Sequence, residues 1–277
     1  MNDLDRLADF VRRHPRLFVL TGAGCSTESG IPAYRDAQGN WKRPAPITLQ
    51  AFMGDEAARR RYWARSLIGW RTIGLARAGP AHRALAQLES AGRLKLLLTQ
   101  NVDGLHSAAG SQRVIDLHGR VDTVRCMACE TRSSRAALQA ELLRRNPQWA
   151  ALDAKAAPDG DADLEARDFS GFDIPACPSC GGLLKPDVVF FGESVPRARV
   201  STALDALAEA DAMLVAGSSL MVYSGFRFVQ AAVAAAKPVA AVNIGRTRAD
   251  DLLSFKIERR VGQTLAALAR HVQEYQT

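Results

Sequence analysis

Residues 17–30, LFVLTGAGCSTESG, lead from a short apolar run into a turn that contains two glycines. Such a run is typical of a buried parallel strand, and glycines at its end are typical of a turn that approaches a phosphate. A tight turn without any ligand would look similar. The dinucleotide fingerprint G-x-G-x-x-G is met at Gly22 and Gly24, but Thr27 stands where the third glycine should be. The stretch therefore predicts a strand and a nucleotide-binding turn that departs from the dehydrogenase pattern.

Several other apolar runs resemble this first one and are separated by helical patterns. Alternation of this kind predicts an open α/β sheet, in which the polar clusters that follow the strands meet at one edge. The expected helices are 80–91, 199–209 and 226–236. The expected strands are Leu17–Thr21, Leu94–Thr99, Val114–Leu117, Ala212–Ala216 and Val239–Val242.

Two stretches interrupt the alternation. Residues from about 36 to 79 are mostly helical in pattern, and RRRYWARSLIGW places Tyr62 and Arg65 on one helical face. The second interruption runs from about 120 to 185, with a helix expected over 135–145 and a loose polar loop over 156–168. These stretches predict smaller modules attached to the sheet.

Two C-x-x-C doublets bracket the second interruption. Four cysteines at this spacing indicate a tetrahedral zinc site in which every ligand position is filled, so the metal should be structural. A redox dithiol is the alternative for either doublet alone. The expected ligands are Cys126, Cys129, Cys177 and Cys180.

Composition narrows the class of protein. The 277 residues are 47% hydrophobic without an apolar run of the roughly 20 residues that a bilayer span needs, so no membrane role is expected. The net charge of +7 would suit a nucleic-acid partner, but the basic residues are scattered, and we interpret them as a solvated surface. The N-terminus lacks the features of a signal or transit peptide, which predicts a cytoplasmic protein.

Polar residues that suit catalysis follow two strands. His118 ends the run VIDLH and could act as a general base, although a lone histidine at a strand end is also common as a structural residue. Residues 100–104, QNVDG, end a neighbouring strand and could equally be a polar turn. About 20 residues beyond the glycine turn, a dehydrogenase would carry an acid for the ribose. Trp41, Lys42 and Arg43 stand there instead, which disfavours hydride transfer.

Taken together, these motifs resemble the sirtuins, which are NAD-dependent protein lysine deacylases. The resemblance rests on GAGCSTESGIPAYR, TQNVDGLH, LHG, the cysteine doublets, KPDVVFFGE, GSSLMVYSG and NIG, in the family's order from about residue 16 to 262. RRRYWARSLIGW, APDGD, VYSGFRF and NIGRTRADDL resemble the class II branch, which includes the mitochondrial lipoamidase and ADP-ribosyltransferase type. The resemblance implies a Rossmann-type parallel sheet (1–35, 91–119 and 186–277), a cofactor loop and helical lobe (36–90) and an inserted zinc-binding module (120–185).

The resemblance also implies roles for particular residues. His118 would be the general base, with Asn101 and Asp103 as further catalytic residues. One structural zinc and NAD, consumed as a co-substrate, are implied. The phosphates would be held by Gly22, Ala23, Gly24, Ser26 and Thr27. The nicotinamide side would involve Ile31, Pro32, Tyr34, Arg35, Gln100, Asn101, Val102 and Asp103. The adenosine side would involve Gly217, Ser218, Ser219, Asn243, Ile244, Gly245 and Val261.

In the implied reaction an acyl-lysine oxygen attacks the ribose carbon as nicotinamide leaves, and His118 accepts a proton from the ribose hydroxyls. The partner is an acyl-lysine protein or peptide bound as an added strand. A protein mono-ADP-ribosyltransferase, a lipoamidase-type deacylase and a non-catalytic NAD sensor are the alternatives. Tyr62 and Arg65 resemble a pair that grips acidic acyl chains, or they are a packed tyrosine and a surface arginine. The other residues implied to contact the substrate are Val188, Val189, Phe190, Phe191 and Gly192, together with the loop from Leu220 to Gly225.

Overall fold

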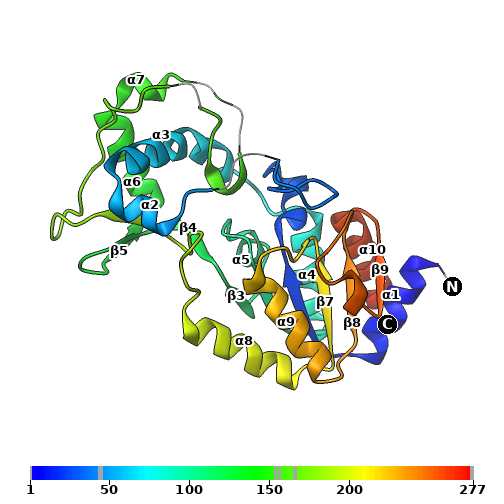
Figure 1. Ribbon diagram of the computed structural model, residues 1–277. Helices are drawn as coiled ribbons and strands as arrows, with labels where there is room; N and C mark the ends of the chain where they lie inside the picture. Colours follow the sequence, from blue (N-terminus) through cyan, green and yellow to red (C-terminus); the bar gives the residue numbers. More distant parts are fainter. Residues whose placement is uncertain (1, 43–45, 153, 155–156, 165–166, 275–277) are drawn as a thin grey trace.

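The computed structural model describes residues 2–42, 46–152, 154, 157–164 and 167–274 (Figure 1). Its centre is a six-stranded parallel sheet, the main sheet, with strand order β3-β2-β1-β7-β8-β9. β1 pairs in register with β2 on one side and β7 on the other, so the first glycine turn lies at the middle of the sheet edge. The strands are β1 (Leu17–Thr21), β2 (Leu94–Thr99), β3 (Val114–Asp116), β7 (Ala212–Ala216), β8 (Val239–Val242) and β9 (Phe255–Ile257).

Helices cover both faces of the main sheet (Figure 1). In β1, Leu17 and Val19 point into one core while Phe18 and Leu20 point into the other, as the two-residue period of a strand requires. The first core contains α1 (Asp3–Arg13), α4 (Pro80–Ser90) and α10 (Val261–Glu274). The second contains α8 (Arg197–Glu209) and α9 (Tyr223–Ala234). A strand buried on both faces explains why the sequence shows unbroken apolar runs.

A second body, the lobe, lies beside the main sheet at the upper left of Figure 1. It combines an antiparallel sheet of order β5-β4-β6 with helices that share one apolar cluster. The strands are β4 (Gly119–Cys126), β5 (Arg132–Ser134) and β6 (Leu184–Val188). The helices are α2 (Leu49–Gly54), α3 (Glu56–Ile73), α6 (Arg135–Arg145), α7 (Pro147–Ala150) and the 3-10 turn η3 (Pro158–Gly160). The remaining short elements are α5 (Leu105–Ala108), η1 (Ala23–Cys25), η2 (Thr27–Ser29) and η4 (Asp250–Leu252).

The predicted α/β sheet with a smaller, four-cysteine lobe is confirmed. The prediction of a loose loop over 156–168 is wrong for residues 157–164, while 156, 165 and 166 lie outside the described residues. Ala157, Ala162 and Leu164 are buried, because small residues allow this segment to lie directly against α3.

The position of α4 bears on the domain boundaries. α4 packs with α1, α10 and the main sheet rather than with the lobe. We therefore propose that the boundary expected at residue 90 lies before Pro80 instead.

Within the described part of the chain, no helix has both the length and the apolar character needed to cross a membrane.

Candidate functional site

The turns after β1 and β7 are packed against each other. The Gly22 N–H donates to the Ala216 carbonyl at 3.1 Å, and the Gly24 N–H donates to the Gly217 carbonyl at 2.8 Å. A Cβ on Gly24 would lie 2.7 Å from the Gly217 Cα, so no larger residue fits there. Both N–H groups are used within the protein. The glycines therefore allow backbone to approach backbone, and phosphate contacts would have to come from other groups of these turns.

The polar cluster after β2 is joined to these turns by hydrogen bonds. Asn101 Nδ2 donates to the Gly22 carbonyl and to Ser26 Oγ, both at 3.0 Å. Ser26 Oγ in turn donates to Asp103 Oδ2 at 2.6 Å, and Gln100 Nε2 donates to Ser218 Oγ at 2.6 Å. Gly22, Ser26, Asn101 and Asp103 thus form one network between the ends of β1 and β2, and Gln100 and Ser218 link the ends of β2 and β7. Residues 100–104 are therefore more than an exposed polar turn, because Asn101 and its partner Ser26 are buried.

His118 follows β3 and is held at both ring nitrogens. Nδ1 lies 2.9 Å from the Gln100 carbonyl oxygen, which can only accept, so we infer that Nδ1 carries the proton. Nε2 lies 2.7 Å from Ser224 Oγ and is then the basic nitrogen. Burial lowers the pKa of His118, and Arg199 and Arg227 lower it further, against an opposing effect of the Gln100 carbonyl. The ring is therefore neutral at physiological pH and able to accept a proton.

Two more histidines lie beneath the network. His82 Nδ1 accepts the Gly79 N–H at 3.0 Å, so its Nε2 is the protonated nitrogen and donates toward Ser26 Oγ at 3.3 Å. The ring of His106 lies 4.6 Å from that of His82, and its Nε2 contacts Thr21 Oγ1 at 2.9 Å. Burial lowers the pKa of both histidines, which keeps this layer uncharged below Asp103.

The segment after η2 crosses from the cofactor turns toward the lobe. The guanidinium carbon of Arg35 lies 3.8 Å from the centre of the Trp41 ring, and the Tyr34 ring meets the same ring edge-on. Trp41 also contacts Phe191 of the expected substrate segment, with ring centroids 5.6 Å apart. At its other side, the Ala37 carbonyl accepts the Arg246 N–H at 2.8 Å. This segment therefore touches both the β8 end and the lobe.

The remaining predicted cofactor residues lie near these turns or at the floor between them. Ile31 and Val102 share a small buried cluster with Ile73 of α3. Asn243 follows β8, and its amide donates to the carbonyls of Ile244 and Gly245. The others are Ala23 in η1, Thr27 in η2, Pro32 beside Ile31, Ser219 after Ser218 and Val261 at the start of α10.

The expected substrate segment, residues 188–192, is anchored by a buried lysine. The Val189 N–H donates to the His118 carbonyl at 2.7 Å, so the segment adjoins the histidine directly. Lys185 is 3% exposed and donates to the Val188 carbonyl, and its Nζ pairs with Glu193 at 3.1 Å. Glu193 also accepts the Phe190 N–H at 2.8 Å. Gly192, with φ of +77°, closes this turn against Gln50.

Tyr62 and Arg65 lie on α3 and are both engaged within the protein. The Tyr62 ring packs against Phe52 and Phe190 with centroid distances of 5.4 and 5.3 Å. Arg65 is not a surface arginine, because only 12% of its side chain is exposed. It binds the Asp161 carboxylate with two nitrogens, Nε at 2.8 Å and Nη2 at 2.6 Å.

The four predicted zinc ligands come together in the lobe. Their sulfur atoms all lie within 4.8 Å of one another, with Cys126 and Cys180 3.5 Å apart and Cys129 and Cys177 3.8 Å apart. Tetrahedral zinc with bonds of about 2.3 Å separates its sulfurs by about 3.8 Å, so the donor set fits this metal. The fifth cysteine, Cys25, is buried, which raises its pKa to about 12, so the thiol stays protonated and packs as a small apolar side chain.

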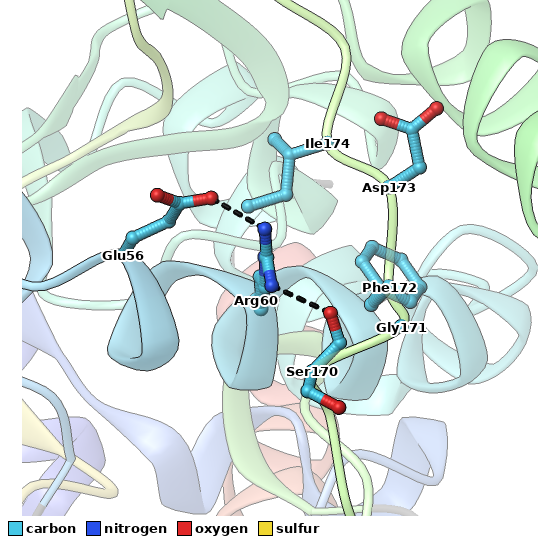
Figure 2. A pocket seen from close by; sticks show the side chains of 7 residues that line it. All are labelled: Glu56, Arg60, Ser170, Gly171, Phe172, Asp173 and Ile174. Carbon is cyan, nitrogen blue, oxygen red and sulfur yellow. Dashed lines mark hydrogen bonds and ion pairs between the residues drawn. The ribbon is translucent and has the colours of Figure 1, made fainter.

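Figure 2 shows a hollow of about 260 Å³ on the lobe, between the start of α3 and residues 170–174. Arg60 projects between its two walls and pairs with Glu56 while donating to the Ser170 carbonyl. Asp173 pairs with Arg145. The charged groups of the hollow are therefore already paired, and it contains no predicted site residue.

This geometry is that of an α/β nucleotide-binding enzyme whose candidate site lies at the strand ends of the main sheet, next to a zinc-binding lobe. The sequence model described as "Sir2 family" matches residues 22–224. The chain therefore belongs to the Sir2 family, the sirtuins.

Individual relatives agree with this assignment. "NAD-dependent protein deacetylase 2" of Bradyrhizobium diazoefficiens is 66% identical over 262 residues, which cover 95% of this chain and 96% of the relative. "NAD-dependent protein deacetylase" of Xanthomonas campestris pv. campestris is also 66% identical, over 95% of this chain and 89% of the relative.

Solved structures of the family show the same fold. A Sir2 homolog–NAD complex is 30% identical, with a TM-score of 0.76 over 99% of this chain and 95% of the other. A structure described as "Sir2-p53 peptide-NAD+" is 28% identical, with a TM-score of 0.75 over 99% of both chains.

Several residues of the site were not singled out from the sequence. Ser224 and His106 lie within the motifs GSSLMVYSG and TQNVDGLH. The sequence therefore indicated the segments that carry them but not the contacts that their side chains make. His82 and Asp161 had no such marker as individual residues, because their partners lie 56 and 96 residues away in the chain.

Proposed function

We propose that this protein is an NAD-dependent protein lysine deacetylase. The observation that carries the proposal is His118, whose Nδ1 is tied to the Gln100 carbonyl so that Nε2 is left as a base at the strand ends. The names of relatives that share two thirds of the sequence support the same activity.

NAD would supply the ribose carbon to which the acyl group is transferred as nicotinamide leaves. The turns after β1 and β7 fit a dinucleotide, because Gly22, Gly24 and Gly217 allow the backbones of the two strand ends to lie directly against each other. Gly22, Ala23, Gly24, Ser26 and Thr27 would lie along the phosphates. Gly217, Ser218, Ser219, Asn243, Ile244, Gly245 and Val261 would lie on the adenosine side.

The nicotinamide side would be formed by the buried network and the segment above it. Asn101 is fixed by the Gly22 carbonyl and Ser26, so its remaining amide oxygen has a set orientation. The Asp103 side chain would lie close to the place where nicotinamide leaves, where a carboxylate stabilises developing positive charge. The other residues proposed here are Ile31, Pro32, Tyr34, Arg35, Gln100 and Val102.

His118 would accept a proton from a ribose hydroxyl at Nε2. Ser224 would yield its hydrogen bond to Nε2 as that hydroxyl arrives, while the Gln100 carbonyl stabilises the protonated ring at Nδ1. The protein's contribution is thus orientation and proton transfer.

We further propose that acyl-lysine proteins or peptides bind beside residues 188–192 as an added strand, since this segment hydrogen-bonds to the residue that accepts the proton. The same arrangement is consistent with solved Sir2 structures described as peptide complexes.

A single product analysis tests the proposal. Wild-type protein, NAD and an acetyl-lysine peptide should give deacetylated peptide and free acyl-ADP-ribose by mass spectrometry, whereas ADP-ribose attached to a protein would favour the transferase alternative. His118→Tyr should abolish turnover while NAD binding, measured by calorimetry, largely survives. Unchanged turnover in this variant would remove His118 from its proposed role.

Within the family we propose the class II branch. Two of its motifs contact each other, since Arg65 of RRRYWARSLIGW pairs with Asp161 at the end of APDGD. Turnover of a lipoyl-lysine peptide at a rate comparable with acetyl-lysine would favour the lipoamidase type within this branch.

A further inference from the structure

The Arg65–Asp161 contact joins the two class II motifs in a fixed geometry. Arg65 and Asp161 form two parallel hydrogen bonds, the arrangement in which a guanidinium binds a carboxylate most strongly. Asp161 Oδ1 also accepts the N–H of Ala162 at 2.8 Å, which orients the carboxylate toward Arg65. Arg65 thus already holds a carboxylate of the protein itself.

The segment that carries Asp161 is built into the lobe. Gly69 lies one turn after Arg65 on α3, and a Cβ there would come within 2.2 Å of the Gly160 carbonyl oxygen. A Cβ on Gly160 would come within 2.7 Å of Ile73. Ala162 and Leu164 are buried on the far side of Asp161. Asp161 is therefore positioned by packing on both sides.

This ion pair lies between two clusters that belong to the candidate site. On one side, Tyr62 contacts Phe190, whose neighbour Val189 donates to the His118 carbonyl. On the other side, Ile73 packs with Ile31 and Val102. Phe190 therefore connects the segment that adjoins His118 with the helix that carries Arg65, and an acyl chain bound beside this segment would face this part of α3.

We propose that Asp161 is a specificity-determining residue, which occupies Arg65 and restricts the reaction to uncharged acyl groups. The inference rests on the proposed deacylase function. A carboxylate at the end of an acyl chain would meet the Arg65–Asp161 ion pair, which has no net charge. To bind Arg65 it would have to displace Asp161 or lie beside that second negative charge. Asp161 is 40% exposed, so its displacement is possible in water and the discrimination is finite.

The test compares four peptides that differ only in the acyl group: acetyl, succinyl, glutaryl and the methyl ester of succinyl. The ester is one methyl group longer than succinyl and has no charge, so faster turnover of the ester would indicate an electrostatic rather than a steric limit. In the wild type, kcat/KM for succinyl should be about tenfold to a hundredfold below that for the ester, the range that one charge-assisted hydrogen-bonded pair supports.

Asp161→Asn should raise succinyl and glutaryl turnover by a similar factor and change acetyl and ester turnover by less than about twofold. Arg65→Met combined with Asp161→Asn should abolish that gain. Glu56→Gln is a matched control, because Glu56 pairs with Arg60 on the same helix. This variant should not change the ratio of kcat/KM between charged and uncharged acyl peptides.

Wild-type turnover of succinyl equal to that of its ester would overturn the inference even if Asp161→Asn were unfolded. An equal rise for charged and neutral chains in Asp161→Asn would overturn it as well, because it would mean a widened pocket. If the wild type releases no acyl group at all, the proposed function fails and this inference fails with it.

Discussion

At the scale of single residues, burial decides which groups of the site carry charge. His82, His106 and His118 are all kept neutral by their surroundings, while Asp103 is held by Ser26 and the Leu105 N–H. The sequence marked His118 and Asp103 by their position after strands. It could not indicate the tautomer of His118, because that depends on the Gln100 carbonyl of a neighbouring strand.

We expect the acid limb of the pH profile of kcat/KM to lie below the ordinary pKa of histidine. His118 must be neutral to accept a proton, and burial lowers its pKa, so activity should persist in mildly acidic solution and fall only below the lowered value. Steady-state rates across the acidic range measure this limb. A midpoint above the pKa of free histidine would contradict the assignment of the group or of its environment.

Lys185 and Glu193 should support the peptide site rather than the NAD site. Glu193→Gln leaves Lys185 buried without its carboxylate, which should lower the free energy of unfolding by about 1–3 kcal/mol, less than for a fully buried pair because Glu193 is one-fifth exposed. The KM for peptide should rise, while the KM for NAD stays close to its wild-type value.

The exposed pair of Lys95 and Glu209 provides the control. Glu209 is 62% exposed, so Glu209→Gln should leave the free energy of unfolding and both KM values close to their wild-type values. Parallel rises of the two KM values in Glu193→Gln would indicate a general loss of structure.

At the scale of elements, the central strands of the main sheet could be predicted because they are buried on both faces. β1, β2, β7 and β8 have the expected bounds, and β3 ends one residue earlier. β9 in the main sheet and β4, β5 and β6 in the lobe were not predicted, since these strands are short or carry charged residues among the apolar ones. Residues 157–164 were misread because Ala and Gly bury little apolar surface, although they pack closely on α3.

Gly69→Ala should destabilise the lobe, although alanine is the better helix former. Its Cβ would overlap the Gly160 carbonyl, so α3 and the η3 segment would have to separate, with a loss of about 1–3 kcal/mol in thermal or denaturant unfolding. Gly54→Ala in α2 is the control, because nothing lies within 4 Å of a Cβ there. Equal stability of both variants would contradict the observed packing.

At the scale of the whole molecule, the four cysteines tie both ends of the insertion to one point. β4 leads from His118 into Cys126, and residues after Cys180 return through β6 to the substrate segment. The sequence therefore predicted a structural zinc site, but the spacing could not show that a metal there would hold together β4, which starts after His118, and β6, which leads to residues 188–192.

Removal of zinc should consequently reduce peptide turnover without destroying the main sheet. A chelator at neutral pH should lower the melting temperature of the lobe and reduce the rate of deacetylation, whereas much of the helical circular dichroism from the main sheet's covering helices should remain. Re-addition of zinc should restore both. Full activity in metal-depleted protein, verified by elemental analysis, would contradict a structural role for the metal.

The segment Tyr34–Trp41 has a consequence for thermodynamic linkage. It is attached to the β8 turn through the Ala37 carbonyl and to residues 188–192, the proposed peptide-binding segment, through Trp41 and Phe191. A ligand that shifts this segment at one attachment changes the free energy of binding at the other, and such coupling is reciprocal by necessity. If a bound peptide multiplies the affinity for NAD by some factor, bound NAD must multiply the affinity for the peptide by the same factor.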